Sequence, residues 1–594
     1  MNANTMDTYQ HTRMSPYAVS LRDKYYLQEW TRTCTDMTVD EELLEFTVWR
    51  PFNVTKLCAA ISHGCSLDSV REYIQQYRED DGDEVFKRMM KQATPVLYYA
   101  IGRNSPEMVS LLIELGISPY GSNDEVHFIP ALPFTVIYGH LHLVDTTEVL
   151  KILIAAGADQ GVIPEDMWEE YLEKPAETWP LKNVRKTERH GWCNSTTRRH
   201  MAQGLNLSQR YYLYLASLRK SPTEREVQLA ELHKAAGLMK MPYCIVGQLS
   251  VLGDLQKRML NYIASNTEEP MVMVFAGPPG HGKTELAMQL GNLLNISSEA
   301  ISCSQMMSDV ELFGSKQGYD RSSEGSSLNN YLAKQSGKYS VVFLDEYDKT
   351  TQKVCNTLLT ILSEGLYRDR RTNQKVDCRK TIWILASNRG DEKVAAFYEQ
   401  NLRQLKDKER LTIDLEPLVS HLRDTFRETW GDPFESRIDE VIPFFPFSLR
   451  EQAVIAHKFL RRIAVEVREN IDLRPETRRH MGQCHISLQD DGRICSYMAE
   501  RGYSRSSGAR GLNREAMRVG QMAREVYNRI PGLVTERSNE EPVEKLEVKL
   551  MPNSNGGPKI GVFRKQGVPA QVGSRINEAS QLEKPQGPKR LFTH

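Results

Sequence analysis

The chain has 594 residues, of which 40% are hydrophobic and 26% are charged. This is close to ordinary globular usage, so wholesale disorder is excluded, and at roughly 150 residues per domain the length suggests about four units. The 76 Lys and Arg residues nearly balance the 77 Asp and Glu residues, for a formal net charge of −1. That balance argues against a globally basic nucleic-acid binder, although it permits local basic stretches.

The ten cysteines are scattered, with no CxxC pair, which argues against a zinc site or a disulfide framework. No apolar run approaches the ~18 residues of a membrane-spanning helix, and Met1 to Ser20 lacks the apolar segment of a secretion signal. We therefore expect no membrane contact and a cytoplasmic location, with a mitochondrial location as the alternative.

Residues 1–48 form a polar lead-in, and 49–165 contain a loose internal repeat. One copy begins at Thr94-Pro95 and ends at Gly116, and a later copy ends at Gly157, 41 positions further on. Thr-Pro is expected to cap a helix start, and glycine permits the left-handed turn that ends a helix. The pattern predicts paired helices, and a third, weaker copy starts near Thr55.

These copies resemble the ankyrin repeat, whose period is about 33 residues. The resemblance implies an all-α repeat region over 49–165 that presents a surface to a protein partner. The alternative is an ordinary helical domain with leucine-rich faces.

Residues 166–240 are predicted to be a basic helical connector. Within it, 181–240 carry 12 Lys or Arg residues against 4 Asp or Glu residues, with aromatic residues between them. Basic residues with interspersed aromatics are also typical of nucleic-acid binding, which we keep as a minor hypothesis.

A phosphate-binding loop follows. The apolar run 271–276 predicts a buried strand, Gly277–Thr284 matches GxxxxGK[ST], and Glu285 to Leu294 predicts a helix. In this context the loop amides approach phosphates, Lys283 reaches the β- and γ-phosphates, and Thr284 can ligate Mg²⁺.

Two further strands end in candidate catalytic residues. The apolar run 341–344 leads into Asp345, suited to Mg²⁺, and Glu346, suited to act as the general base that activates water. Asn388 follows the apolar run 381–387, at the strand end where ligands of α/β sheets bind. This set predicts ATP hydrolysis to ADP and phosphate.

From about Cys244 to Arg529 these motifs resemble the AAA+ ATPases, specifically the Clp type. The resemblance implies that 245–248 flank the adenine, that Arg437 acts as an arginine finger toward a neighbouring subunit, and that Arg510 is the lid's nucleotide contact. It also implies a homo-oligomeric ring, a hexamer. Together, the motif and the resemblance assign the nucleotide to Val246, Gly247, Gly277, Pro278, Pro279, Gly280, His281, Gly282, Lys283, Thr284, Glu285 and Arg510.

Tyr319 has glycines on both sides in the sequence, Gly314 and Gly318 before it and Gly325 after it. In the Clp family this position is a pore loop that grips polypeptide. The two residues after it depart from the family pattern, since they are Asp320-Arg321 where the family has a small apolar residue and Gly. His281 also stands where the phosphate loop commonly has a small or apolar residue, and we expect it to be tolerated because this position contributes mainly its backbone.

The predicted fold is an α/β P-loop AAA+ module with a helical lid, preceded by the all-α ankyrin-like region. The large ATPase subdomain covers 241–440 and the lid 441–566, with a strand at 544–550 and a disordered tail at 567–594. The predicted function is an ATP-driven unfoldase or disaggregase acting on unfolded or aggregated proteins. The alternatives are a nucleotide-gated ankyrin scaffold and a nucleic-acid-linked AAA+ loader.

Overall fold

The computed structural model describes residues 52–81, 83–121, 129–179, 188–219, 222–265, 268–304, 306–315, 324–530, 543–552 and 557–565. The lead-in 1–48, Tyr319 and the tail 567–594 lie outside these ranges. The chain divides into two compact units, one comprising residues up to 465 with 490–520, the other 466–489 with residues from 521 onward.

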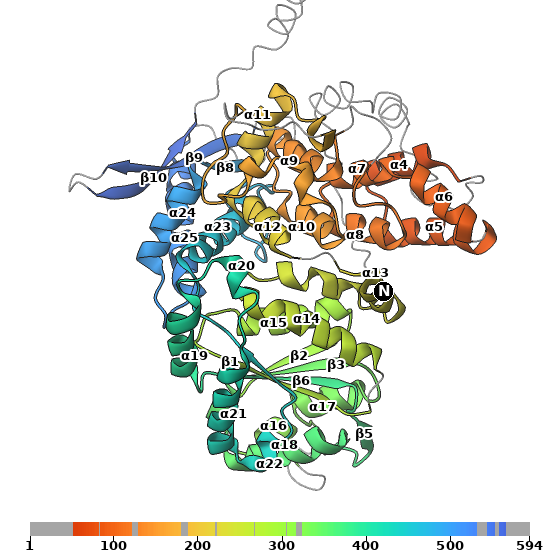
Figure 1. The fold of residues 1–594 in the computed structure, drawn as a ribbon, viewed down its shortest axis with the longest axis vertical. Coiled ribbons are helices and arrows are strands. Elements are labelled where there is room, and N and C mark those ends of the chain that lie inside the picture. Colours follow the sequence, from red (N-terminus) through yellow and green to blue (C-terminus); the bar gives the residue numbers. More distant parts are fainter. Residues whose placement is uncertain are drawn as a thin grey trace, which may run out of the picture. The chain divides into compact units, whose positions relative to one another are not determined.

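The first unit begins with short helices (Figure 1). They are α4 (Val54–His63), α5 (Leu67–Asp81), α6 (Asp83–Gln92), α7 (Pro95–Gly102), α8 (Pro106–Glu114), α9 (Ala131–His142) and α10 (Thr147–Ala155). Gly116 and Gly157 follow α8 and α10 with φ of 102° and 93°, the left-handed conformation that the sequence predicted. The predicted cap at Thr94 is wrong in one respect, because its hydroxyl donates backward to the Lys91 carbonyl instead of capping α7.

Residues 195–232 form α11 (Ser195–Gly204), α12 (Leu207–Leu218) and α13 (Glu224–Leu232). These helices lie within the stretch predicted as a basic helical connector, and the charge count did not indicate their burial. Arg198, Arg210, Tyr211 and Tyr212 are all at most 2% exposed. They belong to the packed interior, and Arg198 pairs there with Asp166.

A five-stranded parallel sheet forms the centre of the ATPase region, in the order β2-β3-β6-β1-β7. Its strands are β1 (Met271–Ala276), β2 (Ser297–Ser302), β3 (Ser340–Asp345), β6 (Thr381–Ser387) and β7 (Glu440–Pro443). Helices α14 (Leu249–Ala264) and α15 (Lys283–Leu294) lie on one side of the sheet, and α17 (Ser327–Lys334) and α18 (Gln352–Glu364) on the other (Figure 1). The predicted α/β P-loop fold and its three motif strands are confirmed.

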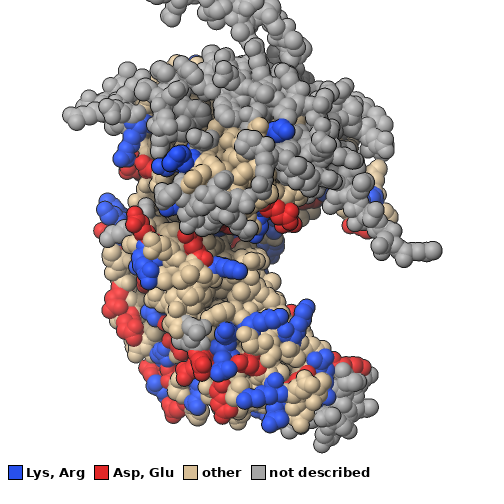
Figure 2. All heavy atoms as spheres, turned by 90° about the vertical axis from the view of Figure 1, so that its right-hand side faces the viewer, with Lys and Arg blue, Asp and Glu red and all other residues tan. Residues whose placement is uncertain are grey.

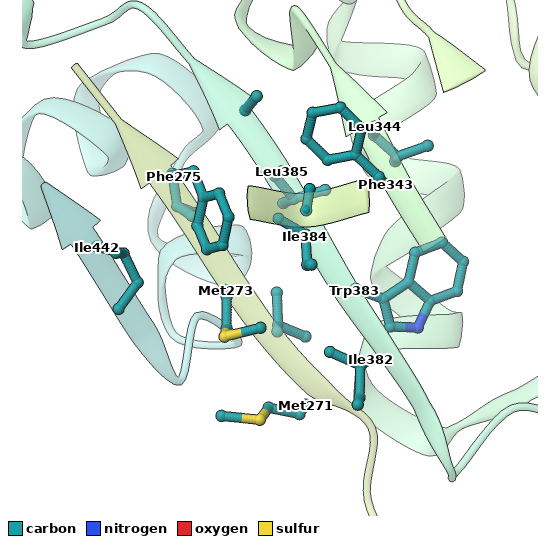
Figure 3. Packing of buried hydrophobic residues seen from close by; sticks show 14 of the residues in the cluster. Met271, Met273, Phe275, Phe343, Leu344, Ile382, Trp383, Ile384, Leu385 and Ile442 are labelled. Carbon is teal, nitrogen blue, oxygen red and sulfur yellow. The ribbon is translucent and has the colours of Figure 1, made fainter. Parts of the chain in front are cut away.

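Apolar side chains on both faces hold the central strands in place. Met273 of β1 pairs in register with Ile384 of β6, and Phe275 with Ile442 of β7, and Figure 3 shows these side chains packed together. Trp383 on β6 is fully buried. Strands covered on both faces read as continuous apolar runs, which is why the sequence located them.

The described ranges also contain a hairpin and eight further α-helices, of which α25 begins in the first unit and ends in the second. They are the hairpin β4 (Leu366–Arg368) with β5 (Lys375–Asp377), and the helices α16 (Asp309–Phe313), α19 (Asp391–Phe397), α20 (Asp407–Arg410), α21 (Glu416–Trp430), α22 (Asp432–Glu435), α23 (Leu449–Glu466), α24 (Asp491–Gly502) and α25 (Ala509–Asn528).

The second unit contains a three-stranded sheet in the order β10-β9-β8. Strand β9 (Glu544–Pro552) contains the predicted strand 544–550 and runs parallel to β8 (Cys484–Leu488) and antiparallel to β10 (Pro558–Arg564). None of the helices in the described ranges is both long enough and apolar enough to span a bilayer.

Replacing Trp383 by Ala is predicted to lower the free energy of unfolding by about 3–5 kcal/mol, because the cavity would lie between the sheet and its covering helices. Urea denaturation followed by circular dichroism measures the change. Leu232→Ala is the control, since Leu232 is 75% exposed. Equal stability of the two variants would contradict the central place of β6 in the core.

Candidate nucleotide-binding and hydrolysis site

The phosphate loop joins the carboxyl end of β1 to the amino end of α15. Gly280 adopts a φ of 77°, and a Cβ at this position would lie 2.5 Å from the Ser507 carbonyl oxygen. Only glycine combines that conformation with such a close approach. The loop residues therefore stand where the motif predicted, between a buried strand and the start of a helix.

Lys283 is a buried cation, with 7% of its surface exposed. Its ammonium donates to the carbonyl oxygens of Gly277 (2.5 Å) and Pro278 (3.0 Å) and to Oδ1 of Asn388 (3.0 Å). In the described part of the chain no carboxylate lies within ion-pair distance of it. Burial lowers the pKa of Lys283 from 10.5 to about 8, so the site favours an added negative charge.

Asn388 reaches Lys283 because β6 lies between β1 and β3 in the sheet. Its backbone N–H donates to Asp348 Oδ1 at 3.2 Å, which fixes the turn after β6. The sequence predicted Asn388 at a strand end, and the structure brings it together with the phosphate-loop lysine. Asp348 was not singled out from the sequence, where it looks like one more polar residue after the Asp-Glu pair.

The residues predicted to bind Mg²⁺ also meet. The Thr284 hydroxyl donates to Asp345 Oδ2 at 3.1 Å, and the Glu346 backbone N–H donates to Asp345 Oδ1 at 2.9 Å. These are oxygen donors of the type that Mg²⁺ prefers, on residues that flank the phosphate loop. The residues present fit the ion.

Glu346 follows Asp345 in the left-handed conformation, with a φ of 54°. Its carboxylate pairs with Lys349 at 2.9 Å, on a side chain that is 36% exposed. An exposed ion pair of this kind is weak, so it can open when a substrate enters. Glu346, the predicted general base, thus lies directly after Asp345, the carboxylate predicted to bind Mg²⁺.

His281 has a role that the sequence did not indicate. Its ring is fully buried and stacks on Phe447, and Nδ1 lies 2.8 Å from the Pro279 carbonyl oxygen. A carbonyl only accepts, so Nδ1 carries the proton and Nε2 accepts from the Tyr503 hydroxyl at 3.1 Å. Burial lowers the pKa of His281 to about 4, so the ring is neutral at physiological pH.

The segment that follows Tyr503 packs directly on the phosphate loop. The Ala509 N–H donates to the Gly280 carbonyl at 2.8 Å, and a Cβ on Gly508 would lie 2.4 Å from that oxygen. Arg510 comes next, with an exposed side chain, and its charge is near enough to contribute to the low pKa of Lys283. The predicted lid arginine is therefore close to the loop.

Val246 and Gly247 are buried, and the residue after them contacts the loop. Gln248, the last residue of the predicted adenine-side segment 245–248, donates from its amide nitrogen to the carbonyls of His281 (3.3 Å) and Phe445 (3.0 Å). The predicted adenine-side segment is thus joined to the phosphate loop by the hydrogen bond from Gln248 to His281.

Two predicted residues point elsewhere. Arg437 donates to the Ser363 hydroxyl at 2.7 Å, to the Pro433 carbonyl at 2.7 Å and to the Ser436 hydroxyl at 2.9 Å. Glu285 forms an ion pair with Lys458. Within the described part of the chain, neither side chain contacts Lys283.

The region that contains the site is similar to known proteins. Residues 268–428 match the model of the AAA domain (Cdc48 subfamily). The chaperone protein ClpB of Chlamydia caviae is 32% identical over 257 residues, covering 42% of this chain and 27% of that protein. A ClpA homologue from Cyanidium caldarium, described as an ATP-dependent Clp protease ATP-binding subunit, is 29% identical over 363 residues, covering 57% of this chain and 38% of that protein.

A solved structure of Hsp104 with ATPγS and FITC casein has a TM-score of 0.41 and 18% identity, covering 83% of this chain and 72% of that one. The chain spans less than two fifths of the length of the two curated relatives. The matched region is thus similar to AAA+ ATPase domains of the Clp type, the class to which the motifs pointed.

Nucleotide affinity is predicted to fall as the pH rises through about 8. The phosphates need Lys283 charged, and its lowered pKa means that the ammonium is lost in this range. The dissociation constant of MgATP should rise up to about tenfold per pH unit above pH 8. In Lys283→Arg the guanidinium stays charged, so the dissociation constant of this variant should not depend on pH in this range. The same pH independence in the wild type would contradict the role of Lys283 in binding the phosphates.

Tyr503→Phe is predicted to destabilise the protein by about 1–3 kcal/mol, because it leaves the buried Nε2 of His281 without a donor. Chemical denaturation measures the loss. Tyr497→Phe is the matched control on α24, where the hydroxyl accepts from Arg501 at an exposed position. The interpretation fails if Tyr503→Phe costs no more than the control.

Proposed function

We propose that the chain hydrolyses ATP to ADP and phosphate and uses the reaction to remodel other proteins, as an unfoldase or disaggregase. The observation that carries the hydrolytic part is the meeting of Lys283, Asn388 and the Thr284–Asp345 pair at the ends of three neighbouring strands. These groups come from three separate segments of the sequence, so chance proximity is a poor explanation.

In this proposal Thr284 and Asp345 hold Mg²⁺, which when bound neutralises charge on the phosphates. The phosphate loop and Lys283 bind the β- and γ-phosphates, because the buried ammonium gains an anionic partner. Glu346 releases Lys349 and accepts a proton from the attacking water. Asn388 orients the lysine and the water through its amide.

The remodelling part rests on the relatives. Two Clp-type proteins share this region, and one of them is named a chaperone. We propose that Arg510 couples the bound nucleotide to the lid, and that Arg437 serves the site of a neighbouring subunit in a six-membered ring. The engagement of Arg437 with Ser363, away from Lys283, supports a role outside its own site. Tyr319, which lies outside the described residues, grips the client polypeptide.

The N-terminal helices are proposed to be ankyrin-like repeats that bind a protein partner. Two helix pairs, α7 with α8 and α9 with α10, support this assignment, because each ends at a left-handed glycine. The cysteines of the sequence are scattered without a CxxC pair, and eight of the nine in the described ranges are buried, which supports a cytoplasmic location, with a mitochondrial one as the alternative.

A nucleic-acid loader is less well supported. Three of the four aromatic residues of the basic stretch, Trp192, Tyr211 and Tyr212, are buried and offer no stacking surface for bases, and the fourth, Tyr214, is partly buried. On the face shown in Figure 2, basic side chains lie among acidic ones across the lower half, where the ATPase sheet is located. A surface of mixed charge attracts a phosphate backbone only weakly.

Glu346→Gln is predicted to retain ATP binding while hydrolysis falls at least about 100-fold, because the amide cannot accept the proton. Phosphate release and binding of a fluorescent ATP analogue measure the two effects. Glu364→Gln, at an exposed helix end, is the control and should hydrolyse ATP normally. Normal hydrolysis by Glu346→Gln would rule out the proposed base.

The proposed action on aggregated proteins is tested with an aggregated reporter enzyme, and ATP hydrolysis is measured in the same samples. The wild type should restore soluble reporter in an ATP-dependent manner, and Tyr319→Ala should hydrolyse ATP without restoring it. Tyr120→Ala is the control, because Tyr120 is an exposed tyrosine that the proposal gives no role. If the wild type hydrolyses ATP but restores no reporter, the remodelling proposal fails and the ATPase proposal stands.

A further inference from the structure

Helix α12 is the most deeply embedded part of the stretch predicted as a connector. Its first turn carries Ser208, Gln209, Arg210 and Tyr211, each at most 2% exposed although each side chain is polar at its end. Buried polar groups require partners. The partners of these four residues come from three different regions of the first unit.

One set of contacts leads to the helices that follow the ATPase sheet. Arg210 forms a two-bond ion pair with Asp491 at the start of α24, with distances of 2.7 and 3.2 Å, and Asp491 also accepts from the Leu207 N–H at 2.7 Å. The Ser208 hydroxyl lies 2.7 Å from Nδ1 of His457 on α23. Both ends of these bonds are buried, so the register between α12 and these two helices is fixed.

A second contact leads to the nucleotide site. The Tyr211 hydroxyl accepts from the Gly247 N–H at 3.2 Å. Gly247 has a φ of 81°, and the neighbouring Gln248 donates to the His281 carbonyl in the phosphate loop. Tyr211 is therefore two hydrogen-bonded steps from the loop that is proposed to hold the phosphates.

The third set leads to the N-terminal helices. The Gln209 amide donates to the Thr146 hydroxyl at 3.3 Å, and the Asn206 amide, just before α12, donates to the Thr147 hydroxyl at 3.2 Å. These threonines begin α10. The residue before them, Asp145, forms a 2.6 Å ion pair with Arg461 on α23.

We propose that α12 couples the N-terminal helices to the nucleotide site, with Tyr211 as the positioning residue that sets nucleotide affinity through Gly247. The proposal rests on the proposed function only in requiring that the phosphate loop binds nucleotide. A shift of α10 acts on α12 through Thr146 and Thr147, and a buried polar network transmits it because its bonds cannot be exchanged for water. Coupling between two sites is reciprocal, so nucleotide must also act on α10.

The test uses the full chain and the conservative change Tyr211→Phe, which keeps the ring and removes the hydroxyl. Tyr212→Phe is the matched control, because Tyr212 is the next residue on α12, is 2% exposed, and carries a ring that contacts Lys151. Thermal unfolding verifies that both variants are folded. Nucleotide affinity and the saturated hydrolysis rate are then measured separately.

Tyr211→Phe is expected to weaken ATP-analogue binding about 5- to 10-fold with a saturated rate within about twofold, the effect of leaving one buried N–H unpaired. Tyr212→Phe should bind within about twofold of the wild type. Equal affinities for wild type and Tyr211→Phe would overturn the positioning role. If the wild type itself binds no nucleotide, it is the proposed function that fails.

Hydrogen exchange tests the connection to the N-terminal helices. Saturating nucleotide should change exchange in the peptides covering 147–155 and 207–218 of the wild type, and the change in 147–155 should be lost in Tyr211→Phe. If nucleotide binds to the wild type but leaves 147–155 unchanged, the coupling proposal is overturned while nucleotide binding stands.

Discussion

The burial of the Lys283 ammonium is the constraint on which the rest of the site depends. A cation with 7% exposure needs partners, and within the described residues it finds two backbone carbonyls and the Asn388 amide instead of a carboxylate. That arrangement leaves an unneutralised positive charge at the ends of parallel strands, the place where ligands of α/β sheets bind. It explains both the lowered pKa of the lysine and the suitability of the loop for a polyphosphate.

The surroundings of the loop extend this constraint outward. Ala509 donates to the Gly280 carbonyl, Tyr503 donates to His281, and Gln248 donates to the His281 carbonyl. Two chain segments distant in sequence, 503–509 and the one at Gln248, thus hold the same few loop residues. A change in the loop on binding phosphate therefore alters the contacts of each segment. These contacts are the physical route for the proposed coupling of ATP to lid movement and to α12.

The sequence predicted the local elements well and the long-range contacts poorly. The runs at 271–276, 341–344 and 381–387 were found because strands buried on both faces are continuously apolar. The sheet order, which places Asn388 beside Lys283, is not encoded in any local pattern. Likewise, His281 and Tyr503 are 222 positions apart, so no local pattern indicates their contact. The charge count of 181–240 also did not show that Arg198 and Arg210 form buried ion pairs. Such contacts depend on tertiary packing, which periodicity and composition do not report.

The most direct test of the account is calorimetric titration of the full chain with MgATP, compared with the Lys283→Met variant at pH 7. The variant keeps an unbranched side chain of similar length and removes the charge, so the account predicts saturable binding to the wild type and an affinity at least about 100-fold lower for Lys283→Met. Equal binding by the two proteins, or no binding by the folded wild type, would contradict the claim that this buried lysine is the centre of a nucleotide site.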